Sequence, residues 1–120
     1  MYYYSVDILR VVDGDTVDVR LDLGFNVWHK CRVRMVGINA PESRTRDLVE
    51  KEKGLAAKAF LKEVLENPDN KIQMQSEGKG KYGRVLGVFF MDEGKRNPTN
   101  INQLMIKKGH AVAYFGGKRK

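Results

Sequence analysis

The chain has little of what builds cross-links, zinc fingers or membrane spans. Its 120 residues include one cysteine, Cys31, and two histidines. One cysteine forms no internal disulfide, so we expect no disulfide partner, and with two histidines it cannot complete a tetrahedral zinc site. No apolar run approaches the roughly 20 residues of a membrane helix, and the first ten residues show no secretory signal. We therefore expect no membrane contact and a cytoplasmic protein, with a processed secreted form as the alternative.

The length of the chain limits the number of domains, and its charge limits the kinds of partner. A chain of this length without repeats or linkers predicts a single domain over residues 1–120. It carries 22 Lys and Arg against 15 Asp and Glu, a net charge of +7. Such an excess attracts polyanions, of which nucleic acid is the commonest in a cell, but a basic surface also keeps a protein soluble. Charge leaves both interpretations open, so a motif must decide.

The first third of the chain predicts an antiparallel β-meander. Apolar, β-branched and polar residues alternate there as in β-strands, over residues 3–12, 16–23 and 27–38. Asp13 and Gly14 between the first two segments are a strong hairpin signal. The third segment directs its basic residues to the outer face, namely Lys30, Arg32 and Arg34.

The rest of the chain predicts a helix, two strands and a shorter helix. The first helix is expected between Asp47, a candidate N-cap, and the Asn-Pro step at residues 67–68, because its apolar positions recur every four residues. Strands are expected over residues 71–75 and 84–91. Thr99 is a candidate N-cap for the short second helix.

Hairpin-linked groups of strands exclude a doubly wound βαβ fold. The pattern predicts a mainly β fold with helices (α+β). In detail, we expect a five-stranded β-barrel of the oligonucleotide-binding (OB) type, with one helix between strands 3 and 4 and a short helix after strand 5.

Three short motifs stand out through their order. They are DGDT, GINAPE and KYGR, at residues 13–16, 37–42 and 81–84. Each alone has a plain structural interpretation, as a hairpin turn, a strand end before proline, or a basic loop. Together with an arginine late in the third strand, the helix AAKAFLKEVLEN and the closing segment NINQLMIKKGHAVAY, they resemble the staphylococcal nuclease family. The resemblance covers nearly the whole chain and implies an OB-barrel that hydrolyses phosphodiester bonds of DNA and RNA with Ca²⁺.

The resemblance implies a metal site formed by Asp15, Asn39 and the main-chain carbonyl of Ala40. Calcium is a hard cation that takes carboxylate and carbonyl oxygens. The family has a second carboxylate where this chain has Asn39, and fewer ligand charges mean weaker calcium binding. Ala40 replaces a hydroxyl side chain, which matters little where the carbonyl is the ligand.

The resemblance also implies that Arg34 and Arg84 hold the scissile phosphate and that Glu42 is the general base for the attacking water. A guanidinium donates bidentately to phosphate oxygens and stays charged at any working pH. Together with the metal, the arginines would neutralise charge on a five-coordinate phosphorus transition state. A general base contributes on the order of 100- to 10,000-fold. Attack would run in line with the departing 5′ oxygen and leave a 3′-phosphate.

Further residues match the family's contacts with the nucleotide. Lys81, Tyr82 and Tyr114 correspond to residues that contact the terminal phosphate or stack near the nucleotide, although the register at Tyr114 needs a one-residue gap. Trp28 lies on the strand face that carries the arginines. It could stack a base or serve a structural role at the barrel rim.

Two other functions remain open at this point. One is a noncatalytic OB-fold module that binds nucleic acid and has an impaired metal site, an interpretation that Asn39 and the basic surface favour. The other is a structural domain that acts through protein contacts. Chelator sensitivity separates the enzyme from the binding module, because binding through lysine and arginine depends on salt instead.

Overall fold

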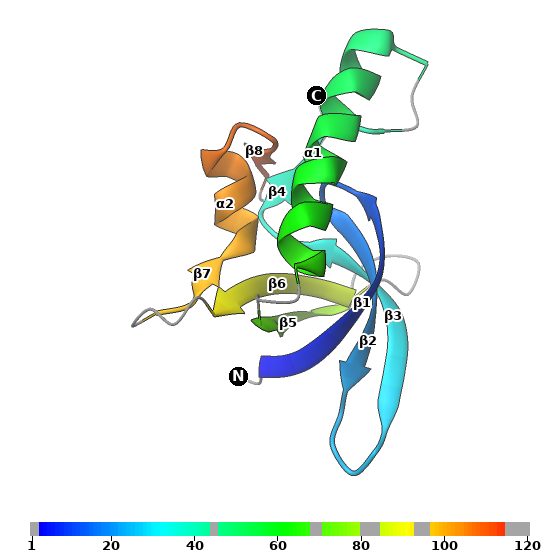
Figure 1. Cartoon of the computed structure of the whole chain (residues 1–120), viewed down its shortest axis with the longest axis vertical. Helices are drawn as coiled ribbons and strands as arrows, with labels where there is room; N and C mark the ends of the chain where they lie inside the picture. The colour runs from blue at the N-terminus through cyan, green and yellow to red at the C-terminus, as the bar shows by residue number, and fades with distance from the viewer. Residues whose placement is uncertain (1–2, 44–45, 68–70, 80–84, 93–96, 115–120) are drawn as a thin grey trace.

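The chain folds into a closed β-barrel with two helices packed on it (Figure 1). The structure is a computed structural model and describes residues 3–43, 46–67, 71–79, 85–92 and 97–114. Within these ranges the elements, in chain order, are β1 (Tyr3–Asp13), β2 (Thr16–Asp22), β3 (Trp28–Met35), β4 (Ile38–Asn39), α1 (Leu48–Glu66), β5 (Lys71–Lys79), β6 (Val85–Asp92), β7 (Thr99–Asn100), α2 (Ile101–Lys107) and β8 (Val112–Ala113).

The barrel closes through two kinds of strand pairing. Antiparallel pairs run in the order β3-β2-β1-β5-β6-β7, and a short parallel pairing of β3 with β6 joins the two sides of the sheet. This parallel seam matches Val33, Arg34 and Met35 with Val85, Leu86 and Gly87. The α+β fold with a five-stranded OB-like barrel and a helix between its third and fourth strands is therefore confirmed.

The β1–β2 hairpin turns where the DGDT motif predicts it, since Asp13 pairs with Thr16. Gly14 in this turn lies against two alanines. A Cβ atom at Gly14 would lie 2.8 Å from the Cβ of Ala57 in α1 and 2.9 Å from that of Ala40. Glycine is therefore required here for close packing, which brings helix α1 directly onto the turn.

Both ends of α1 agree with the sequence, with Asp47 as N-cap and Asn67 as C-cap, but the start of α2 does not. The side chain of Asp47 caps α1 by accepting from the N–H groups of Val49 at 3.0 Å and Glu50 at 3.3 Å. The N-cap of α2 was predicted one residue too early. Thr99 lies in β7, and Asn100 instead accepts from the N–H of Gln103 at 3.1 Å.

The third predicted strand is interrupted. The expected strand over residues 27–38 breaks after Met35, and Gly37 has a φ of +83°. Glycine takes this left-handed conformation without the penalty of a Cβ atom. The chain therefore turns, and the short strand β4 pairs with β8 instead of continuing along β2. The break carries residues 38–40 toward the β1–β2 turn.

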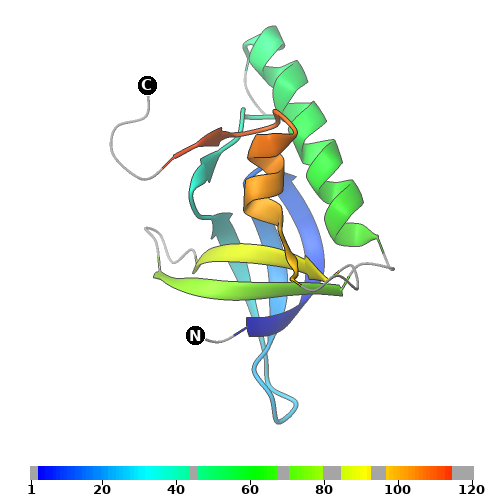
Figure 2. The same cartoon turned by 90° about the vertical axis from the view of Figure 1, so that its left-hand side faces the viewer.

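Asn102 fastens α2 to this part of the barrel and is buried. Its Nδ2 donates to the carbonyls of Val36 at 2.8 Å and Gly87 at 3.2 Å, and its Oδ1 accepts from the N–H of Phe89 at 3.2 Å. Figure 2 shows α1 and α2 together at one end of the barrel, with the β2–β3 hairpin projecting at the other. Neither helix, over its described residues, is long and apolar enough to cross a membrane.

Candidate active site

Asp15 is the central acidic group of the candidate site. It lies in the β1–β2 turn and is only 7% exposed. Its Oδ1 accepts from the Thr16 hydroxyl at 2.9 Å, and its Oδ2 accepts from the backbone N–H of Ala40, also at 2.9 Å. Both carboxylate oxygens are thus held in place, one by the next residue and one by the segment that follows the Gly37 turn.

Arg34 connects this carboxylate with Asn39. Its Nη1 donates to the carbonyl of Met35 at 2.7 Å. Its Nη2 lies 3.5 Å from Asp15 Oδ2 and 3.4 Å from Asn39 Oδ1. The structure therefore brings together four of the predicted site residues, Asp15, Arg34, Asn39 and Ala40, from the β1–β2 turn, the end of β3 and the segment after it.

The donor set partly fits a calcium ion. Asp15, Asn39 and the carbonyl of Ala40 offer only oxygen atoms, the ligands that a hard cation prefers. No group of three His, Cys, Asp or Glu side chains suited to a metal exists among the described residues. One carboxylate and one amide oxygen already share the Nη2 group of Arg34. A cation that takes both oxygens would thus compete with this guanidinium.

The side chain of Glu42 is exposed, and the next residue, Ser43, is held by hydrogen bonds. Ser43 is buried and donates to Asp13 Oδ1 through its hydroxyl and, at 3.3 Å, through its N–H. A Cβ atom at Gly54 of α1 would overlap the carbonyl oxygen of Glu42 and lie 2.7 Å from the nitrogen of Ser43. The helix backbone therefore packs directly on the loop that carries Glu42.

Two pockets adjoin this cluster. An apolar one of about 370 Å³ is lined by Arg34, Met35, Val36, Gly37, Ile38, Leu86 and Tyr114. The N–H of Tyr114 donates to the carbonyl of Gly37 at 2.8 Å, and this hydrogen bond holds the backbone of Tyr114 at the pocket that Arg34 also lines. A second, more open pocket of about 530 Å³ lies between the segment from Asn39 to Pro41, the start of α1 and the turn that follows α2.

Three predicted site residues, Lys81, Tyr82 and Arg84, lie outside the described residues. Their roles stay predictions. Three residues that the sequence analysis did not connect to the site support it, namely Asp13, Ser43 and Gly54. Asp13 was visible as part of the DGDT motif. The other two gave no signal, because their contacts join segments far apart in the chain.

The chain is similar in sequence to a known family and to several known proteins. A family model for the staphylococcal nuclease homologue matches residues 32–120. The chain is 33% identical to protein ParB of Escherichia coli over 117 residues, which is 93% of this chain and 59% of ParB. It is 34% identical to endonuclease YhcR of Bacillus subtilis over 119 residues, covering 93% of this chain and 9% of YhcR.

A third relative is the micrococcal nuclease of Shigella flexneri. It is 33% identical over 112 residues, which is 90% of this chain and 57% of that enzyme. The chain therefore spans less than two thirds of each of these three relatives.

Proposed function

The chain belongs to the staphylococcal nuclease family, and we propose that it is a calcium-dependent nuclease that hydrolyses phosphodiester bonds of DNA and RNA with little sequence preference. The observation that carries this proposal is the contact of Arg34 with Asp15 and Asn39. This contact supports the proposal because a guanidinium, a group that can bind phosphate, lies directly beside oxygen atoms of the kind that a hard metal ion prefers.

In the proposed mechanism, Asp15, Asn39 and the carbonyl of Ala40 would hold the calcium ion. When bound, the ion supplies positive charge against the developing negative charge on the phosphate. Arg34 donates from its guanidinium to the phosphate oxygens, and Arg84 is proposed to do the same. Electrostatic stabilisation of this kind acts where charge grows in the transition state.

Glu42 is proposed to accept the proton of the attacking water. The water oxygen bonds to phosphorus and the bond from phosphorus to the 5′ oxygen breaks. The products are a 3′-phosphate and a 5′-hydroxyl, whose oxygen takes up a proton from solvent. The loop around Glu42 is held by Ser43 and by the close approach of Gly54. This support keeps the carboxylate-bearing segment in place without burying its side chain, which stays accessible to water.

The apolar pocket beside Arg34 is proposed to hold a base of the substrate. Leu86 and Tyr114 line it, and an aromatic ring beside a phosphate-binding arginine suits a nucleotide. Tyr114 is therefore proposed to contact the nucleotide, together with Lys81 and Tyr82.

The direct test is cleavage of denatured DNA by the purified protein, with Ca²⁺ and with a chelator. We expect Ca²⁺-dependent fragments from the unmodified protein and a loss of about 100-fold or more in Glu42→Gln. Glu63→Gln, which makes the same change on the exposed surface of α1, is the matched control and should cleave normally. Full activity in the chelator would contradict the metal requirement, and full activity in Glu42→Gln would contradict the role of the base.

The amide at position 39 gives a separate test of the metal site. Asn39→Asp adds a second carboxylate and should tighten calcium binding, because ligand charge sets affinity in such sites. Titration calorimetry measures this directly, and an unchanged affinity would contradict the proposed ligand set.

One observation favours a second function. The described residues hold no cluster of three acidic or other metal-binding side chains. If DNA binds in a salt-sensitive way but is not cleaved even at high calcium, the chain is a noncatalytic OB-fold module that binds nucleic acid.

A further inference from the structure

The outer face of β3 carries a regular row of cationic and aromatic side chains that the candidate active site uses only at one end. We call it the β3 row and define it as Trp28, Lys30, Arg32 and Arg34. Alternate residues of a strand share a face. In register with them on β2 lie Asp22, Arg20, Asp18 and Thr16. The β3 row therefore runs along the sheet surface from Arg34 in the site to the base of the projecting hairpin.

The carboxylates on this face already accept hydrogen bonds, Asp22 from the backbone N–H of Gly24 at 2.9 Å and the other two from arginines. Asp18 accepts from Arg32 Nε at 2.8 Å and from Nη2 at 3.2 Å, and this guanidinium holds the pKa of Asp18 below its ordinary value. Asp7 accepts from Arg20 at 2.6 Å. Lys30, in contrast, has no carboxylate within ion-pair distance in the part of the chain that the structure describes. Its positive charge is available to an anionic ligand.

Trp28 ends the β3 row with an accessible ring that the Arg20 guanidinium contacts. The side chain is 45% exposed, although it lies in a regular strand. The guanidinium of Arg20 sits 4.7 Å from the centroid of the Trp28 ring. Such a cation–π contact is modestly stabilising and favours one orientation of the indole ring. An exposed ring held in this way can serve as a stacking platform for an unpaired base.

The spacing of the β3 row also suits a polynucleotide. Alternate residues of an antiparallel strand lie about 6.8 Å apart, so the row from Arg34 to Trp28 spans about 20 Å. This repeat is similar to the separation of successive phosphates in an extended single strand. A duplex keeps its bases stacked inside and offers none to Trp28, which favours a single-stranded ligand.

We propose that the β3 row binds the single-stranded part of a nucleic acid that continues away from the cleavage site, with Lys30 near its backbone and Trp28 stacked on a base. This inference rests on the proposed function for its choice of ligand. Binding to the row nevertheless needs neither metal nor cleavage, so the two proposals fail separately.

The chain's single tryptophan makes the proposal directly measurable, because Trp28 is the only source of tryptophan fluorescence. The unmodified protein is titrated with an oligodeoxythymidylate in the presence of a chelator, which prevents metal-dependent cleavage. We expect the emission of Trp28 to be quenched as the oligonucleotide binds. Binding without any change in this emission would overturn the proposal and leave the proposed nuclease untouched.

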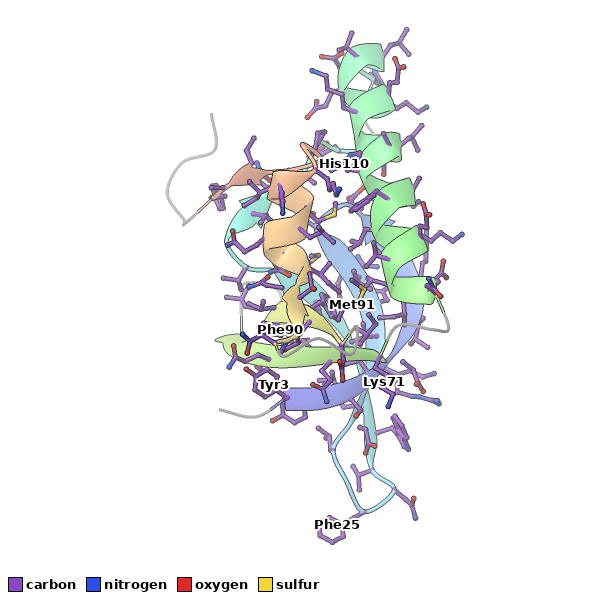
Figure 3. The ribbon with its side chains drawn as sticks, turned by 60° about the vertical axis from the view of Figure 1, so that its left-hand side comes forward. Tyr3, Phe25, Lys71, Phe90, Met91 and His110 are labelled. Atoms are coloured by element: carbon purple, nitrogen blue, oxygen red, sulfur yellow. The ribbon has the colours of Figure 1, made fainter. Side chains whose placement is uncertain are left out.

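Variants then separate stacking from general hairpin contact. With a labelled oligonucleotide and fluorescence anisotropy, Trp28→Ala should bind about tenfold more weakly, a typical loss for one stacked base. Phe25→Ala is the matched control, because Phe25 is fully exposed at the tip of the same hairpin and points away from the barrel (Figure 3). Equal weakening by both variants would assign the effect to a nonspecific apolar contact and overturn the proposal.

The charge contribution is tested through salt dependence. Lys30→Ala should reduce the slope of log K against log salt concentration by about 0.7, the value for one phosphate contact with a single strand. Lys62→Ala, which removes a lysine from α1, should leave the slope unchanged. Equal slopes for all three proteins, or binding of duplex as tight as that of single strand, would overturn the proposal.

Discussion

The two ends of the β2–β3 pair share one hydrogen-bond ladder but differ in what covers them. At the site end, Val17, Val33 and Met35 are fully buried in the hydrophobic core of the barrel. At the hairpin end, Leu23 is half exposed and Phe25 is fully exposed. The two ends therefore differ in how much apolar surface they bury, and not in their strand pairing. We call the buried end the firm end and the exposed end the open end. The firm end positions a candidate catalytic cluster, whereas the open end presents side chains to a ligand.

The largest effect is expected where α1 touches the loop that carries Glu42. Gly54→Ala puts a methyl group onto the backbone of Glu42 and Ser43. Overpacking against backbone should lower the free energy of unfolding by about 3 kcal/mol. Helix propensity alone predicts the opposite, a gain of about 1 kcal/mol. Urea denaturation decides, and a midpoint that rises would show that the loop is not packed on the helix as described.

A smaller loss at the same end should follow from Ser43→Ala. It removes the hydroxyl that donates to Asp13 Oδ1, and among the described residues the N–H of Ser43 remains as a donor to this carboxylate. We expect unfolding to become easier by about 1.5 kcal/mol. Ser5→Ala, at an exposed position of β1, is the control, with a change below about 0.5 kcal/mol. Thermal or urea unfolding of both variants checks this. Equal effects of the two substitutions would contradict a stabilising role of the hydrogen bond from Ser43 to Asp13.

Midway along the strands, Asp18→Asn should cost about 0.5 kcal/mol at pH 7, since its ion pair with Arg32 is largely exposed. Because Arg32 lowers the pKa of Asp18, the carboxylate contributes stability above its unfolded pKa of about 3.9, and this contribution is lost as pH falls through the lowered pKa. The difference between the two proteins should therefore shrink in acid. A difference that persists at pH values below both pKa values would contradict the ion pair as its source.

The smallest effect belongs to the hairpin tip. Phe25 has a φ of +54°, in the left-handed region that a bulky side chain rarely adopts. Phe25→Asn should stabilise the protein slightly, by up to about 0.5 kcal/mol, because asparagine tolerates this conformation and no packing is lost. Phe25→Ala lacks that tolerance and should give no gain. A clear destabilisation in urea would mean that the tip packs on the barrel, contrary to its exposure.

The sequence predicts well what depends on neighbours in the chain. The hairpin at Asp13 and Gly14, the N-cap at Asp47 and the strand pattern of β2 are all local, and the structure confirms each. The sequence could not distinguish the two ends of the β2–β3 pair, since alternation continues through both. Only tertiary packing decides which apolar residues of such a pattern become buried.

The candidate site shows the same limit. Motif order was enough to select Asp15, Arg34 and Asn39, which the structure places in contact. Nothing in the sequence connects Gly54 with the site, because its partner is a loop about a dozen residues earlier. The sequence likewise gives no sign that Asn102 is buried. It is buried because three backbone groups need a partner there.

The parallel seam between β3 and β6 also orders events during folding. Its three residue pairs join parts of the chain that are far apart in sequence, while the β1–β2, β2–β3 and β5–β6 pairs are hairpins between consecutive strands. Contacts between distant segments form late, because the loop between them must first lose its freedom. Arg34 lies in this seam, paired with Leu86. A chain still in the course of folding thus has its hairpins, which carry Asp15 and Arg34, before it has the apolar pocket that Arg34 and Leu86 line, so this pocket should form only with the final closure of the barrel.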